Sequence, residues 1–155
     1  MSRLDHRTAV ITGAAIGIGR ATAKKMASLG ANLVLVDMDE EGLATCKLEC
    51  EAFGVNALTF AADVSDETRA NEIIDEAAKR FDHIDILVNN AGIIKRIPMC
   101  EMKASEFRQV IDVDLNAPFI VSKAVIPSMI KKGHGKIINI CSMMSELGRE
   151  TVSAY

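Results

Sequence analysis

The chain has 155 residues, a length typical of one domain, and its 18 basic and 21 acidic residues give a net charge of −3. This balance argues against a basic nucleic-acid surface, and a hydrophobic content of 49% argues against disorder. No apolar run approaches the roughly 20 residues that cross a bilayer, and the N-terminal residues 1–7 are too polar for a secretory signal. We therefore expect a cytoplasmic protein that binds neither nucleic acid nor membrane.

Short apolar runs alternate along the chain with longer amphipathic segments. The runs are rich in β-branched residues, which is typical of strands that are covered on both faces in a parallel sheet. The predicted strands are residues 8–12, 31–37, 57–61, 84–88 and 136–141.

The amphipathic segment between the second and third predicted strands predicts a helix. It carries Leu43, Cys46, Cys50 and Phe53 on one stripe and ends at Gly54. The two cysteines, one helical turn apart, are therefore interpreted as core residues. The other two cysteines and the three histidines are scattered, and no C-x-x-C pair occurs. We expect neither a disulfide framework nor a bound metal.

Two further helices are predicted. Ser65 is the expected N-cap of one whose apolar residues recur at helical spacing from Ala70 to Phe81. The other spans about 104–132. Pro118 cannot donate a hydrogen bond to the carbonyl of Asp114, so we expect a kink between these two residues.

Strands that alternate with helices predict a doubly wound α/β sheet. No linker, internal repeat or low-complexity segment interrupts the pattern, so residues 1–155 are expected to form one domain.

A glycine-rich turn, T-G-A-A-I-G-I-G at residues 12–19, joins the first strand to the helix that follows. Glycines at such a turn let a diphosphate approach the backbone, and the helix N-terminus offers free amides and a positive dipole end. The turn lacks the G-x-G-x-x-G spacing and the lysine of a P-loop. We interpret it as a dinucleotide-binding turn.

The second strand ends at Asp37, eighteen residues after Gly19. A carboxylate there accepts hydrogen bonds from the adenosine ribose hydroxyls and repels a 2′-phosphate. Its neighbours Ile16 and Met38 carry no compensating positive charge. These residues predict NAD as the cofactor in preference to NADP.

These motifs resemble the short-chain dehydrogenase/reductase family along the whole chain. The resemblance is carried by T-G-x-x-x-G-x-G, by Asp63-Val64 after the third strand, by N-N-A-G at 89–92, and by Asn116, Ser142 and Tyr155. It implies a Rossmann fold with parallel strands in the order 3-2-1-4-5. It also implies an NAD(P)-dependent exchange between a secondary alcohol and a ketone, with a homotetramer as the usual assembly.

The resemblance also assigns roles to individual residues. Asn116, Ser142 and Tyr155 are expected to be catalytic, with Tyr155 as the acid/base and Ser142 as a donor to the reacting oxygen. The cofactor-binding residues are expected to be Gly13, Ile16, Gly17, Ile18, Gly19, Asp37, Asp63, Val64, Asn90, Ala91 and Gly92.

The family's catalytic lysine lies four residues after the tyrosine, beyond the end of this sequence, and the family has two more strands. We therefore expect this chain to be C-terminally truncated relative to the family. By itself it is expected to be inactive, since the lysine that assists the tyrosine in the family is missing.

The segments 92–99 and 140–151 are similar to those of family members that interconvert gluconate and 5-keto-gluconate. A sugar-acid substrate would meet Arg96, Ser142, Glu146 and Arg149, which follow the fourth and fifth strands. Arg96 is a candidate partner for the carboxylate, and Glu146 for sugar hydroxyls or a cation. The alternatives are a reductase of another carbonyl, such as a keto-deoxy-gluconate or a 3-oxoacyl carrier, and a dinucleotide-binding fragment without turnover.

Overall fold

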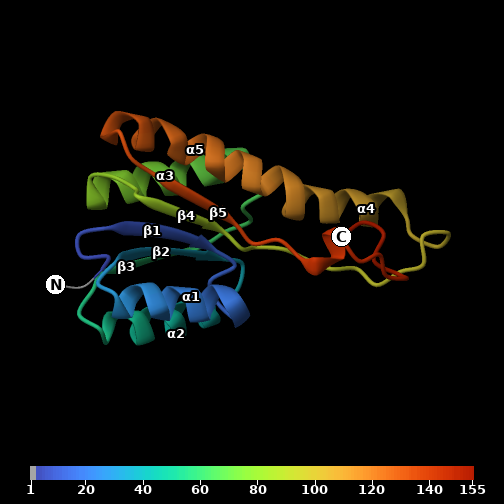
Figure 1. Ribbon diagram of the computed structural model, residues 1–155, viewed down its shortest axis with the longest axis horizontal. Helices are drawn as coiled ribbons and strands as arrows, with labels where there is room; N and C mark the ends of the chain where they lie inside the picture. Colours follow the sequence, from blue (N-terminus) through green and yellow to red (C-terminus); the bar gives the residue numbers. More distant parts are fainter. Residues whose placement is uncertain (1–2) are drawn as a thin grey trace.

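The structure, a computed structural model, describes residues 3–155; Met1, Ser2 and the side chain of Ser145 lie outside the description. Its centre is a five-stranded parallel sheet in the order β3-β2-β1-β4-β5 (Figure 1), which confirms the predicted order. The strands are β1 (Thr8–Thr12), β2 (Asn32–Asp37), β3 (Ala57–Ala61), β4 (Ile86–Asn89) and β5 (Lys136–Asn139).

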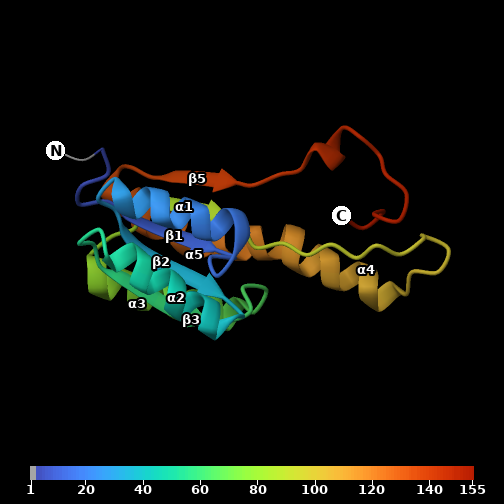
Figure 2. The same cartoon turned by 90° about the horizontal axis from the view of Figure 1, so that it is seen from below.

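Helices cover both faces of the sheet. On one face lie α1 (Gly17–Ser28) and α2 (Glu40–Glu51), and on the other α3 (Glu67–Phe81) and α5 (Ala117–Lys132) (Figures 1 and 2). Helix α4 (Ala104–Ile111) runs through a π-helical turn, η1 (Asp112–Asn116), into α5 and projects beyond the carboxyl ends of the strands. A short 3₁₀ helix, η2 (Met143–Ser145), follows β5.

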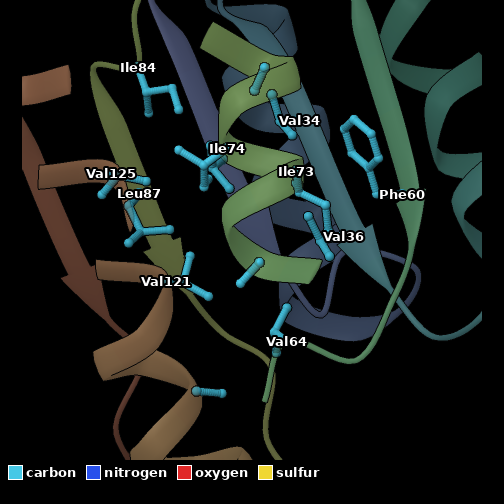
Figure 3. Packing of buried hydrophobic residues seen from close by; sticks show 14 of the residues in the cluster. Val34, Val36, Phe60, Val64, Ile73, Ile74, Ile84, Leu87, Val121 and Val125 are labelled. Carbon is cyan, nitrogen blue, oxygen red and sulfur yellow. The ribbon is translucent and has the colours of Figure 1, made fainter. Parts of the chain in front are cut away.

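Two apolar clusters hold these layers together. Successive strand residues point to opposite faces, so Val34 and Val36 face α3 while Leu33 and Leu35 face α1 and α2. Figure 3 shows the first cluster, in which strand residues meet side chains of α3 and α5: Val34, Val36, Phe60, Ile73, Ile74, Leu87, Val121 and Val125. The second cluster contains both Cys46 and Cys50, as expected of core residues.

Strand β5 lies at an exposed edge of the sheet. All four of its residues are exposed, including Ile137 and Ile138. The β-branched run alone predicted a strand covered on both faces, but the absence of the family's two further strands predicted an exposed edge at Ile137, Ile138 and Ile140, and this second prediction is confirmed. Within the described chain it pairs only with β4, and no helix covers it on the far side.

The start of α3 also differs from the prediction. Its N-cap is Asp66, whose carboxylate accepts a hydrogen bond from Arg69 N at 3.1 Å. Ser65 instead donates its own amide and hydroxyl to Asp63 Oδ1, at 2.9 and 2.7 Å. Ser65 therefore belongs to the turn that follows β3, and the helix begins one residue later than predicted.

The continuous helix from Ala104 to Lys132 is, by length and composition alone, a candidate membrane span among the described residues; its most apolar stretch has a mean hydropathy of 1.2. The sequence analysis considered only unbroken apolar runs and therefore did not identify this segment, whose apolar residues are interspersed with polar ones. Val121, Val125 and Met129 are buried in the cluster that α3 also lines. One face of α5 therefore packs in the core, while most of the segment is exposed.

Candidate functional site

A cavity of about 750 Å³ lies at the carboxyl ends of β1, β2, β3 and β4. Its lining includes ten of the eleven predicted cofactor-binding residues: Gly13, Ile16, Gly17, Ile18, Asp37, Asp63, Val64, Asn90, Ala91 and Gly92. The carboxyl edge of a doubly wound sheet is where ligands bind in this fold class. The sequence-predicted set therefore forms one continuous surface.

The eleventh predicted residue, Gly19, lies behind the surface. A Cβ at Gly19 would overlap the carbonyl oxygen of Gly13, and a Cβ at Gly13, whose φ is +65°, would lie 2.8 Å from Asn90 Nδ2. These two glycines let α1 begin directly against β1 and β4. Both shape the turn, and of the two only Gly13 lines the cavity.

Helix α1 begins at this turn without a side-chain cap. Its N-cap residue is Ile16, and its first turn carries no acidic residue. The first amides of a helix have no intrahelical acceptor and carry the positive end of the dipole. Because Ile16, Gly17 and Ile18 line the cavity, this helix end is suited to a diphosphate.

The carboxylate of Asp37 lies at the end of β2. Its Oδ2 accepts from Ala15 N at 3.0 Å and its Oδ1 from Asp39 N at 3.1 Å. These bonds orient the group at the rim of the cavity and leave acceptor capacity on both oxygens. The arrangement fits a pair of ribose hydroxyls.

Asn90 serves chiefly as a clamp for the glycine-rich turn. Its side-chain Nδ2 donates to the carbonyl oxygens of Thr12 and Gly13, at 3.1 and 3.0 Å. The hydroxyl of Thr12 in turn accepts from the amides of Asn90 and Ala91, both at 3.0 Å. These four hydrogen bonds fix the loops after β1 and β4 to each other where both line the cavity.

The predicted irregularity near Pro118 takes the form of the π-helical turn η1. Asn116 is exposed there, donates to Asp112 Oδ1 at 2.8 Å and does not line the cavity. Asp112 and Val113 are the residues of this turn that line the cavity. Asp114 instead ties the turn to the loop after β4, since its Oδ1 accepts from Ile93 N at 2.8 Å. Burial raises the pKa of Asp114, and the hydrogen bond from Ile93 opposes the rise.

Sequence reasoning did not select Asp114, although it identified the Asp114 carbonyl as the one that Pro118 leaves without a donor. It also did not select the cavity-facing residues of α4 and of the first position of η1. These are Ser105, Arg108, Gln109 and Asp112. Their i, i+3, i+4, i+7 spacing marks one polar helix face and would have been a usable signal.

Ser142 and Tyr155 do not line the cavity. Ser142 caps η2, its Oγ accepting from Met144 N at 3.2 Å. Tyr155 is 46% exposed. Within residues 3–155, no hydrogen bond joins the side chains of Asn116, Ser142 and Tyr155, so their catalytic roles stay predictions.

The predicted substrate residues lie on two neighbouring segments. Ile97 N donates to Thr151 O at 2.8 Å, which ties the loop after β4 to the segment after β5. Arg96, Glu146 and Arg149 are exposed on these segments, outside the lining of the cavity. No group of three His, Cys, Asp or Glu side chains in the described chain is arranged to hold a metal.

Comparisons with known proteins agree with this geometry. The family model described as short chain dehydrogenase matches residues 7–155. A 2-dehydro-3-deoxy-D-gluconate 5-dehydrogenase of Formosa agariphila is 41% identical over 96% of this chain and 57% of its own length. A gluconate 5-dehydrogenase of Gluconobacter oxydans is 39% identical over 98% and 59%. The chain thus spans less than two thirds of the length of these relatives.

Solved structures give the same result. An NAD⁺-bound xylitol dehydrogenase matches with a TM-score of 0.95 and 31% identity, over 99% of this chain and 59% of its own. A levodione reductase matches with a TM-score of 0.94 and 36% identity, over 99% and 60%.

Proposed function

The chain belongs to the short-chain dehydrogenases, and from that premise we propose that it forms the cofactor-binding part of an NAD-dependent oxidoreductase acting on a sugar acid. The observation that carries this proposal is the cavity between the uncapped N-terminus of α1 and the Asp37 carboxylate. A bound nicotinamide cofactor would accept hydride from a secondary alcohol or deliver it to a ketone.

The residues present fit such a cofactor. The amides at the start of α1 would hold the diphosphate, and Asp37 the adenosine ribose. Val64, which is buried beside Asp63, would contact the adenine, and Ala91 and Gly92 the nicotinamide side. Asp37 favours NAD because a 2′-phosphate at this carboxylate would meet a like charge, with neutral Ile16 and Met38 beside it.

The sugar-acid substrate is supported by the relatives and by the joined segments after β4 and β5. The hydrogen bond from Ile97 N to Thr151 O joins the loop that carries Arg96 to the segment that carries Arg149. A guanidinium there would pair with a carboxylate. Ser142 would donate to the reacting oxygen, and Tyr155 would exchange its proton. A keto-deoxy-gluconate is the second candidate, because a dehydrogenase named for it is 41% identical.

The test is a substrate panel with the full-length protein that contains this chain. We expect turnover of gluconate with NAD⁺ and of 5-keto-gluconate with NADH, and lower kcat/KM with NADP⁺. A tenfold preference for NADP⁺ would contradict the role of Asp37. Higher kcat/KM for 2-dehydro-3-deoxy-gluconate would select the second candidate, and turnover of neutral ketones alone would exclude both.

A variant pair tests the carboxylate contact. Arg96→Ala is expected to raise KM for the sugar acid about tenfold, as expected for a lost charge-assisted hydrogen bond, and to leave a neutral polyol unaffected. Lys95→Ala, which removes the neighbouring charge, is the matched control. Equal effects of Arg96→Ala on the two substrates would remove Arg96 from the carboxylate site.

A further inference from the structure

Helix α4 forms a wall of the cavity that the sequence analysis did not anticipate. Ser105, Arg108 and Gln109 line it from one face of α4, and Asp112 and Val113 continue this face into η1. Val113 also lines a small hollow with Val64 and Ala91. The wall therefore adjoins the end of β3, where the proposed cofactor places its adenosine half.

The charges around the cavity are unevenly distributed. Arg108 is the sole Lys, Arg or His that lines it in the part of the chain that the structure describes, whereas Asp37, Asp63 and Asp112 contribute carboxylates. A dinucleotide adds a diphosphate with two negative charges. Without Arg108, every charged side chain that lines the cavity would be acidic, and an anionic ligand would meet only like charge there.

The acidic residues of the lining have local donors, but Arg108 does not. Asp37 accepts from Ala15 N, Asp63 from Ser65, and Asp112 from Asn116. The guanidinium of Arg108 is exposed and makes no hydrogen bond, ion pair or ring contact with any residue in the described range 3–155. An anionic ligand can therefore pair with the Arg108 guanidinium without first displacing an acidic side chain of the protein.

We propose that Arg108 is a further cofactor-binding residue, whose positive charge attracts the anionic adenosine diphosphate half of the dinucleotide from α4. This inference rests on the proposed dinucleotide site. The contribution is electrostatic: it acts on phosphorylated adenosine ligands, weakens with added salt and has no counterpart for neutral adenosine.

The experiment uses the full-length protein and measures displacement of NADH fluorescence by ADP-ribose and by adenosine, at low and high salt. The variants are Arg108→Gln, Arg108→Lys and the control Lys131→Gln, which removes one exposed charge from the far end of α5. Unchanged far-ultraviolet circular dichroism confirms that each variant is folded.

At low salt, Arg108→Gln is expected to weaken ADP-ribose binding about fivefold, the scale of one partly solvated charge interaction. Arg108→Lys should restore most of the affinity, high salt should reduce the difference, and adenosine and Lys131→Gln should show no change.

An effect of Arg108→Gln below twofold at low salt, or equal losses for ADP-ribose and adenosine, would overturn the inference and leave the cofactor site intact. Failure of the unsubstituted protein to bind NADH would instead overturn the proposed function and the inference together.

Discussion

Asp114 connects the π-helical turn to the loop that follows β4. Its Oδ1 accepts from Ile93 N at 2.8 Å, and burial raises its pKa above 3.8. The folded protein therefore holds the Asp114 proton more tightly than the unfolded chain does. The stability that this proton confers is complete below pH 3.8 and is lost as the pH rises through the folded pKa.

Because the pKa of Asp114 is raised, an asparagine at this position should stabilise the protein at neutral pH. Asp114→Asn keeps an acceptor for Ile93 N and removes the ionisable group, so its free energy of unfolding should equal that of the unsubstituted protein at acidic pH and exceed it at pH 7. Asp114→Ala should lower stability by about 1 kcal/mol at both, because Ile93 N loses its acceptor. Urea unfolding across this pH range is the measurement. An Asn variant that is less stable at pH 7 would contradict the prediction.

At the scale of elements, Asp85 joins the starts of three strands. It is fully buried, its Oδ2 accepts from Thr8 N at 2.9 Å, and its Oδ1 lies 2.6 Å from Arg7 Nη1. Its backbone amide donates to Thr8 O, and its carbonyl accepts from Lys136 N. The carboxylate also lies 3.1 Å from His83 Nε2. β1, β4 and β5 thus share one polar anchor at the edge opposite the cavity.

Removal of this anchor should be costly. Asp85→Ala leaves the buried Thr8 N without an acceptor, whereas the partly exposed Arg7 is solvated once its partner is gone, so we expect a loss of about 1–3 kcal/mol in the free energy of unfolding. Asp75→Ala, at an exposed position of α3, is the control and should change stability by less than about 0.5 kcal/mol. Denaturant unfolding measures the stability of both variants, and unchanged m values would show that the difference reflects the folded state. Equal, small effects would show that the anchor is dispensable.

For the molecule as a whole, the outer edge of β5 is the exposed feature of greatest consequence. Ile137, Ile138 and Ile140 are 37%, 43% and 43% exposed, and the strand pairs only with β4 among the described residues. An unpaired edge that carries apolar side chains is a template for pairing with other chains. The far longer relatives have additional chain that this sequence does not contain.

We therefore expect residues 1–155, produced alone, to self-associate. Ile138→Lys should shift the population toward monomer in sedimentation velocity, since a charge on an edge strand opposes pairing. Leu48→Lys replaces an exposed leucine of α2 with the same charge and should have no effect. A monodisperse monomer from the unsubstituted chain, or equal effects of the two lysines, would exclude association through β5.

The parallel sheet, the glycine-rich turn and the position of Asp37 could all be predicted from the amino-acid sequence. These features depend on local causes: apolar runs of strand length, glycines at a strand-to-helix turn, and a carboxylate at the end of a strand. Ten of the eleven predicted cofactor residues line one cavity, because parallel strands bring their carboxyl ends to the same edge.

Which side chains of α4 and η1 reach the cavity depends on how these elements pack against the loops after β3 and β4. Asn116 and Asp114 are two residues apart and so lie on different sides of the helix, and one bonds to Asp112 and the other to Ile93. The apolar pattern of β5 by itself did not indicate its exposure, because burial depends on which elements lie beside a strand; the absence of the family's further strands did predict it. Arg108 became a candidate when the fold placed it, unpaired, among three carboxylates.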